Sequence, residues 1–124
     1  PLVSGAAIRF AGQLAVFDLR RAGSPCYHCL FPDEASGLED RCATLGVFAP
    51  LTGVIGAMQA GEAIRLVAQG ASPASSRLAL FDADAMEWQT IDIQRNPQCA
   101  VCGDSSRAFS SEVGTGSREE NALK

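Results

Sequence analysis

Residues 26–29 read Cys-Tyr-His-Cys, and residues 99–102 repeat the same spacing as Cys-Ala-Val-Cys. A gap of two residues lets both sulfurs of a pair point at one ion, and four thiolates form the ligand set of a closed tetrahedral zinc site. The two pairs are separated by 69 residues, far more than in a zinc ribbon. We therefore expect the metal to join two distant stretches of the domain after the chain between them has folded.

Disulfide bonds, a redox-active dithiol and an iron–sulfur cluster are the alternatives for these cysteines. Disulfides are typical of short secreted proteins, and the chain shows no visible signal peptide. A redox pair needs one activated thiol, usually at the start of a helix, whereas both pairs lie in turn-like sequence. Spacing and compartment favour structural zinc, and we interpret His28 as exposed or as a donor to the ligands. The predicted ligands are Cys26, Cys29, Cys99 and Cys102.

The composition indicates a single modest domain. The chain has 124 residues, 47% of them hydrophobic, and its ten basic and fourteen acidic residues give a net charge of −4. Nine of the ten basic residues are arginines, so neither a nucleic-acid interface nor a polybasic membrane patch is expected. Residues 43–61 carry no charge, but their proline, threonines and four glycines make membrane insertion weak, and we expect a buried helix there.

The longest predicted element is a helix that begins near Pro50 and ends at Gly70, with apolar residues recurring at close to helical spacing. Gly53, Ala57 and Gly61 stand four apart on it, and we expect this small-residue strip to pack closely on the sheet or on another helix. The whole protein's dimer contact is the other use we consider for the strip.

Strands are predicted at residues 14–18, after a glycine bend, and in an antiparallel hairpin of residues 77–82 and 87–93. Residues 2–8 fit either a strand or the end of a helix. Residues 32–42 read as an acidic surface loop. We expect residues 1–104 to form the domain and residues 105–124 to be a flexible, serine-rich tail.

Several short motifs follow one another between Pro1 and about Gly103. They are Gly12-Gln13, Pro25-Cys26-Tyr27-His28-Cys29, Gly46-Val47, Pro50-Leu51, Gly53-Val54-Ile55-Gly56, Phe81-Asp82-Ala83 and Arg95-Asn96-Pro97. Their order resembles the C-terminal half of the MoeB/ThiF/HesA family, bacterial relatives of ubiquitin-activating enzymes. The resemblance implies an α/β fold: the C-terminal part of a Rossmann-like activating enzyme, with mixed or antiparallel strands, one long helix and the four-cysteine zinc site.

The resemblance also implies a function for the intact enzyme. It would bind ATP and magnesium in the cytoplasm and adenylate the C-terminal Gly-Gly of a ubiquitin-like sulfur carrier of the MoaD or ThiS type, for molybdopterin or thiamin biosynthesis. It would be a homodimer. The family's glycine-rich nucleotide loop and its magnesium-binding aspartate belong to the N-terminal half and have no counterpart here. We therefore expect this chain, as a piece of a longer protein, to be inactive by itself.

Cys42 matches the family cysteine on a crossover loop, which in some members takes over the activated carboxylate or a persulfide. Two alternatives remain open for Cys42: a covalent role in the intact enzyme, or a loop cysteine without a chemical role. Tyr27-His28 departs from the family's more usual Tyr-Arg, which puts any role of that arginine in doubt. The rival hypothesis is a non-catalytic, zinc-stabilised interaction module, and a rubredoxin-like domain would need iron.

Overall fold

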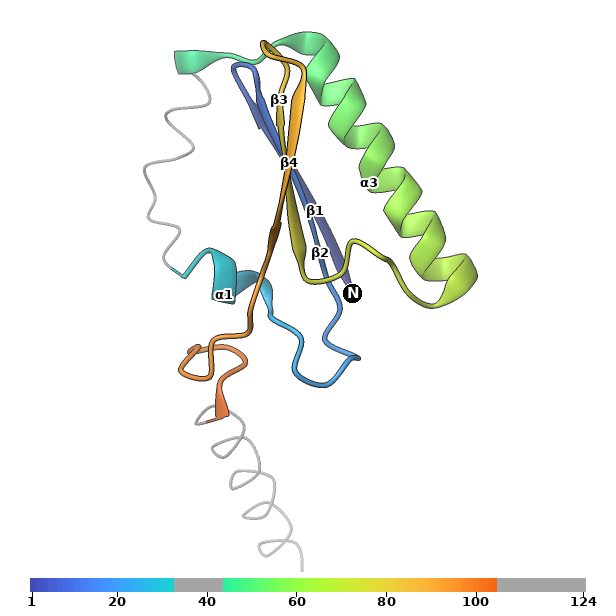
Figure 1. Ribbon diagram of the computed structural model, residues 1–124, viewed down its shortest axis with the longest axis vertical. Coiled ribbons are helices and arrows are strands. Elements are labelled where there is room, and N and C mark those ends of the chain that lie inside the picture. The colour runs from blue at the N-terminus through green and yellow to red at the C-terminus, as the bar shows by residue number, and fades with distance from the viewer. Residues whose placement is uncertain (33–43, 105–124) are drawn as a thin grey trace, which may run out of the picture.

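The computed structural model describes residues 1–32 and 44–104 of the chain, and it shows an α/β fold (Figure 1). Four strands form one antiparallel sheet in the order β1-β2-β3-β4. The strands are β1 (Leu2–Ile8), β2 (Ala11–Phe17), β3 (Arg77–Asp82) and β4 (Glu87–Asp92), and the helices are α1 (Tyr27–Leu30) and α3 (Ala49–Gln69). The predicted tail and the acidic loop with Cys42 lie outside the described residues.

The pairing of the strands settles the structure of residues 2–8 and the place where β2 begins. Residues 2–8 form a strand, because each of them pairs with a residue of β2, from Leu2 opposite Phe17 to Ile8 opposite Ala11. β2 begins at Ala11, so Gly12 lies within the strand and not in the bend expected there. The predicted hairpin is confirmed, with Arg77 opposite Asp92 and Asp82 opposite Glu87.

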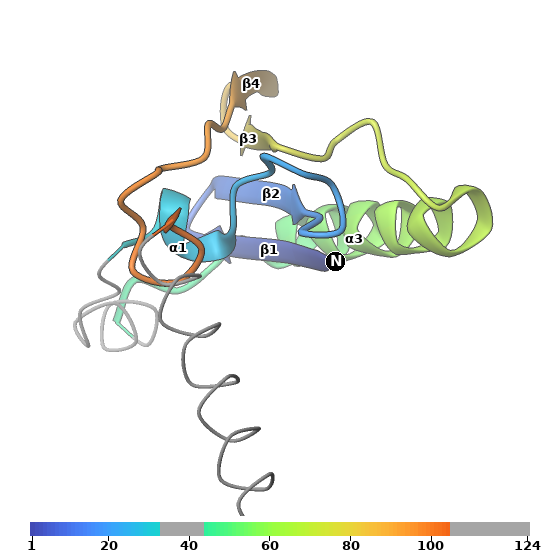
Figure 2. The same cartoon turned by 90° about the horizontal axis from the view of Figure 1, so that it is seen from below.

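The two helices pack on opposite faces of the sheet, as the view in Figure 2 shows. Side chains alternate between faces along a strand. Ala15, Phe17 and Leu78 point to the face where Tyr27 and Leu30 of α1 complete a small core. The other face carries a second core, formed by Leu51 and Ile55 of α3 with Phe81 of β3.

Small residues do allow a close approach to α3, but they belong to the sheet. A Cβ on Gly12 would lie 2.8 Å from Ile55 Cδ1, and one on Gly5 would lie 2.5 Å from Gln59 Cδ. The expectation that the Gly53–Gly61 strip packs on the sheet is wrong. A Cβ on Gly53 or Gly61 would have nothing within 4 Å among the described residues. The larger residues of α3 decide which side is buried, and the glycine strip faces away.

Both ends of α3 lie next to the residues from which the sequence predicted them, Pro50 and Gly70. Pro50 lies in the first turn, and Gly70 closes the helix with a left-handed φ of 72° while donating its N–H to the Leu66 carbonyl. Over the described part of the chain, no helix combines the length and hydropathy that crossing a bilayer requires. The uncharged run that opens α3 belongs instead to a helix that supports the sheet.

Candidate metal centre

Two short backbone turns present the four cysteines. The first knuckle, residues 26–29, is the start of α1, where Cys26 is the residue that precedes the helix and Cys29 donates its N–H to the Cys26 carbonyl at 3.0 Å. The second knuckle, residues 96–103, follows β4. Here Cys99 donates its N–H to Asn96 and Gly103 donates to Cys99. The sheet fixes the relation between the knuckles, because one follows β2 and the other follows β4.

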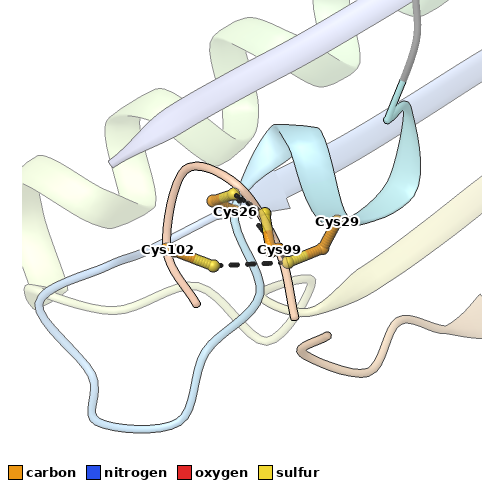
Figure 3. Close-up of side chains that lie close together, drawn as sticks. All are labelled: Cys26, Cys29, Cys99 and Cys102. Carbon is orange, nitrogen blue, oxygen red and sulfur yellow. Dashed lines mark hydrogen bonds between the residues drawn. The ribbon is translucent and has the colours of Figure 1, made fainter. Parts of the chain in front are cut away.

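The four sulfurs converge on one point (Figure 3). All four Sγ atoms lie within 4.8 Å of one another. The pair Cys26–Cys29 is 3.8 Å apart, Cys26–Cys99 is 3.7 Å apart and Cys29–Cys102 is 3.4 Å apart. Zinc–sulfur bonds of about 2.3 Å in tetrahedral geometry place sulfurs roughly 3.8 Å apart. The described residues therefore form a group that could hold one metal ion, as the sequence predicted.

The same distances exclude disulfide bonds in this structure. The shortest of these three separations is 3.4 Å, whereas a disulfide bond is about 2.05 Å long. All four cysteines are free thiols, and three of them are buried. His28 follows Tyr27 on α1 and does not belong to the group of side chains close enough to share an ion. His28 is half-buried and not exposed, and its role as a donor to the ligands stays a prediction.

Gly103 is part of the second knuckle for steric reasons. A Cβ at this position would overlap the carbonyl oxygen of Cys99 and lie 2.7 Å from the carbonyl oxygen of Pro97. Two backbone hydrogen bonds also close the turn here. The N–H of Gly103 donates to the Cys99 carbonyl at 2.8 Å, and the N–H of Asp104 donates to the Pro97 carbonyl at 3.2 Å. Only glycine leaves room for the turn that carries Cys99 and Cys102.

The surroundings of the thiols lower the pKa of one of them and raise the pKa of two others. The backbone N–H of Cys102 and, further, that of Val101 hold the pKa of Cys99 at about 6, although burial opposes this. Burial raises the pKa of Cys26 to about 12, and burial also raises the pKa of Cys29. Asn96 donates its N–H to the Cys29 sulfur at 3.5 Å. Cys99 thus becomes a thiolate more readily than Cys26 or Cys29, and a cation between the sulfurs would stabilise the thiolate form of those two.

Sequence reasoning overlooked Arg95, which lies four residues before Cys99. In the sequence Arg95 is part of a motif only, whereas in the fold its side chain donates to the Cys102 carbonyl at 2.7 Å and to the Asp104 carboxylate at 2.9 Å. A basic residue just before a cysteine pair was the available signal. Cys42 lies outside the described residues, so its covalent role stays a prediction.

Comparisons with known proteins place this geometry in context. The ThiF family profile matches residues 1–101. The molybdopterin-synthase adenylyltransferase of Salmonella typhimurium is 46% identical over 106 residues, which cover 83% of this chain and 41% of that protein. The sulfur carrier protein adenylyltransferase of Thermus thermophilus is 41% identical over 108 residues, covering 84% of this chain and 40% of that protein.

The fold has solved counterparts as well. The structure of Escherichia coli MccB with succinimide aligns with a TM-score of 0.60 at 18% identity, over 82% of this chain and 31% of that one. At this identity the likeness concerns the fold alone. The chain spans about two fifths of the length of the two curated relatives described above.

Proposed function

Because the chain belongs to the ThiF family, we propose that it is the C-terminal part of an ATP-dependent adenylyltransferase that activates the C-terminal Gly-Gly of a ubiquitin-like sulfur carrier. The observation that carries the proposal is the 46% identity to a molybdopterin-synthase adenylyltransferase over 83% of the chain. A second relative named for sulfur-carrier adenylylation supports the same class of reaction.

The proposed reaction joins the carrier's terminal carboxylate to the α-phosphorus of ATP and expels pyrophosphate. The product is a mixed anhydride with AMP as its leaving group, which a sulfur donor attacks to give a thiocarboxylate. The ATP and magnesium sites belong to the part of the relatives that this chain does not match, so residues 1–124 alone would be inactive. The carrier would be of the MoaD or ThiS type, and the enzyme a homodimer in the cytoplasm.

The metal proposed for the cysteine cluster is zinc, held by Cys26, Cys29, Cys99 and Cys102. When bound, the zinc supplies four strong bonds and leaves no open position for water or substrate, so its role is structural. The chain's own contribution is to hold residues 1–104 as one domain. α1 and the segment after β4 are joined at one end of the sheet, while α3 supports the other face. Residues 105–124 would follow as a flexible tail.

The test uses the full-length protein with purified MoaD-type and ThiS-type carriers. With its own carrier the protein should convert ATP to AMP and pyrophosphate, and a sulfur donor should then yield carrier thiocarboxylate, detected by mass. A carrier that lacks its last glycine is the control and should give neither product. Absence of ATP cleavage with every carrier would reject the enzyme in favour of the alternative, a non-catalytic zinc-stabilised interaction module.

The role of Cys42 is tested in the same assay. Adenylation itself needs no protein thiol, so Cys42→Ala should leave carrier-dependent ATP cleavage within about twofold of the original rate. If the thiol accepts the activated carboxylate or carries a persulfide, thiocarboxylate formation should fall while ATP cleavage continues. Loss of both activities together would contradict this division of steps.

A further inference from the structure

Arg95 connects the end of β4 to the second knuckle. Its Nη2 donates to the carbonyl oxygen of Cys102 at 2.7 Å and to Oδ1 of Asp104 at 2.9 Å. The Arg95 side chain is 17% exposed, whereas the Asp104 side chain is 74% exposed. The guanidinium is therefore held largely out of water beside the knuckle, and the carboxylate meets it from the solvent side.

On its buried side, the Arg95 guanidinium has a hydrogen-bond donor that no described residue satisfies. Its Nε is buried and has no hydrogen-bond partner among the described residues. Leaving such a donor unpaired is costly, particularly on a charged group. The guanidinium therefore lies against the backbone of Cys102, one of the four cysteines of the cluster.

A divalent metal ion bound by four thiolates leaves a negative charge that its surroundings have to offset. One divalent ion with four thiolates carries a net charge of −2, and the cluster is mostly buried. Backbone N–H groups offset part of this charge, including that of Asn96 on Cys29. Arg20, Arg65 and Arg77 pair with carboxylates elsewhere in the described chain. Arg95 donates one hydrogen bond to the second knuckle, at the Cys102 carbonyl, and one to Asp104 directly after it.

We propose that Arg95 is a positioning residue of the metal centre, whose guanidinium offsets the negative charge of the metal–thiolate group while it holds the Cys102 carbonyl in place. This inference rests on the proposed zinc site. The positive charge strengthens zinc binding, and the hydrogen bond keeps the second knuckle in the conformation that directs Cys99 and Cys102 inward. The Asp104 carboxylate accepts a hydrogen bond from Arg95 and carries the opposite charge, so neutralising Asp104 should not weaken zinc binding.

Zinc dissociation constants of the full-length protein, measured by competition with a chromophoric chelator, test this inference. Arg95→Gln keeps amide donors but loses the charge, and should weaken zinc binding about tenfold, the usual scale for groups surrounding metal ligands. Arg95→Lys keeps the charge on a flexible stem and should stay within about threefold of the original. Asp104→Asn should bind zinc equally or more tightly.

Arg77→Gln is the matched control, because it removes one arginine whose partner is the exposed Asp92 on the neighbouring strand. It should leave zinc binding unchanged. Cobalt(II) substitution adds a readout that misfolding does not imitate: the sulfur-to-cobalt charge-transfer band should move to lower energy in Arg95→Gln and stay in place in Arg95→Lys and Arg77→Gln.

The outcomes separate the two proposals. If the original protein binds no zinc, the metal site itself is rejected. If it binds one zinc and Arg95→Gln binds with the same dissociation constant, only the role of Arg95 is rejected. Arg95→Lys as weak as Arg95→Gln, or Asp104→Asn weaker than the original, would also overturn the inference, because charge would not be what Arg95 contributes.

Discussion

At the scale of single residues, Asp18 shows how a buried charge joins distant parts of the fold. The side chain is 1% exposed at the end of β2. Its two oxygens accept from Nε and Nη2 of Arg20, each at 2.8 Å, and Arg20 donates onward to the Gly70 carbonyl at 3.0 Å. The bonds from Arg20 lower the pKa of Asp18 from 3.8 to about 2. The end of β2 is thus tied to the end of α3.

This depressed pKa gives a pH prediction. Because the folded pKa lies below the ordinary value, the stability contributed by ionised Asp18 is complete above about pH 4 and is lost as the pH falls towards 2. Asp18→Asn should lower Tm at pH 6, and the difference from the original protein should shrink between pH 4 and pH 2. Thermal melts at each pH measure it. A difference that stays constant down to pH 2 would contradict the ionic contribution.

Gly103 gives a second prediction at this scale. A methyl group at this position meets backbone oxygens that cannot move without opening the second knuckle. Gly103→Ala should cost about 1–3 kcal/mol of overpacking, which corresponds to zinc binding weakened about 5-fold to 150-fold. The chelator competition assay measures it. Gly61→Ala, where a Cβ meets nothing within 4 Å, is the control and should leave zinc binding as it was.

At the scale of elements, the sequence predicted what depends on local pattern. Helix α3 and the β3–β4 hairpin carry their own periodicity, and Pro50 and Gly70 mark the helix ends. β1 has no such pattern, and it is a strand because β2 pairs with it along its whole length. The glycine strip of α3 does not pack on the sheet, because spacing shows that a close approach is possible and does not show to what. Its packing on another helix or in a dimer stays a prediction. The cysteine spacing predicted the cluster, whereas the position of Arg95 depends on the tertiary fold.

The contact between α3 and the sheet can be tested with two alanine variants. Gly12→Ala would place a methyl group 2.8 Å from Ile55 and 2.9 Å from Leu51, and should destabilise the protein by about 1–3 kcal/mol. Gly56 lies on α3 itself, and a Cβ there would meet nothing within 4 Å among the described residues. Gly56→Ala should be neutral or stabilising by up to about 1 kcal/mol, because alanine favours helix over glycine. Urea unfolding measures both, and equal effects would contradict the packing described.

At the scale of the whole molecule, the cysteine cluster closes a loop that contains most of the described structure. Cys26 and Cys99 are 73 positions apart, and the helix α3 and two strands lie between them. A cross-link that closes a loop of this length contributes about 4 kcal/mol in the chain-entropy estimate for disulfides. Bound zinc should act in the same direction on the folded protein.

Metal removal should therefore lower the stability of the whole domain. After extraction with a strong chelator, Tm should fall by more than about 10 °C, since one kcal/mol corresponds to several degrees in a domain of this size. Added zinc should restore Tm, and added magnesium, which avoids thiolates, should not. Elemental analysis should first show that the extracted protein is free of metal. If its Tm is then unchanged, the metal does not stabilise the fold by joining the two knuckles.

The separation of the two knuckles also has a consequence for synthesis on the ribosome. The first two thiols emerge while the second pair is still 69 residues from being made. At about 5–20 residues per second this interval lasts several seconds. During that time the nascent chain offers only half of the proposed zinc site. Zinc would therefore bind late, after the β3–β4 hairpin and the second knuckle have left the exit tunnel.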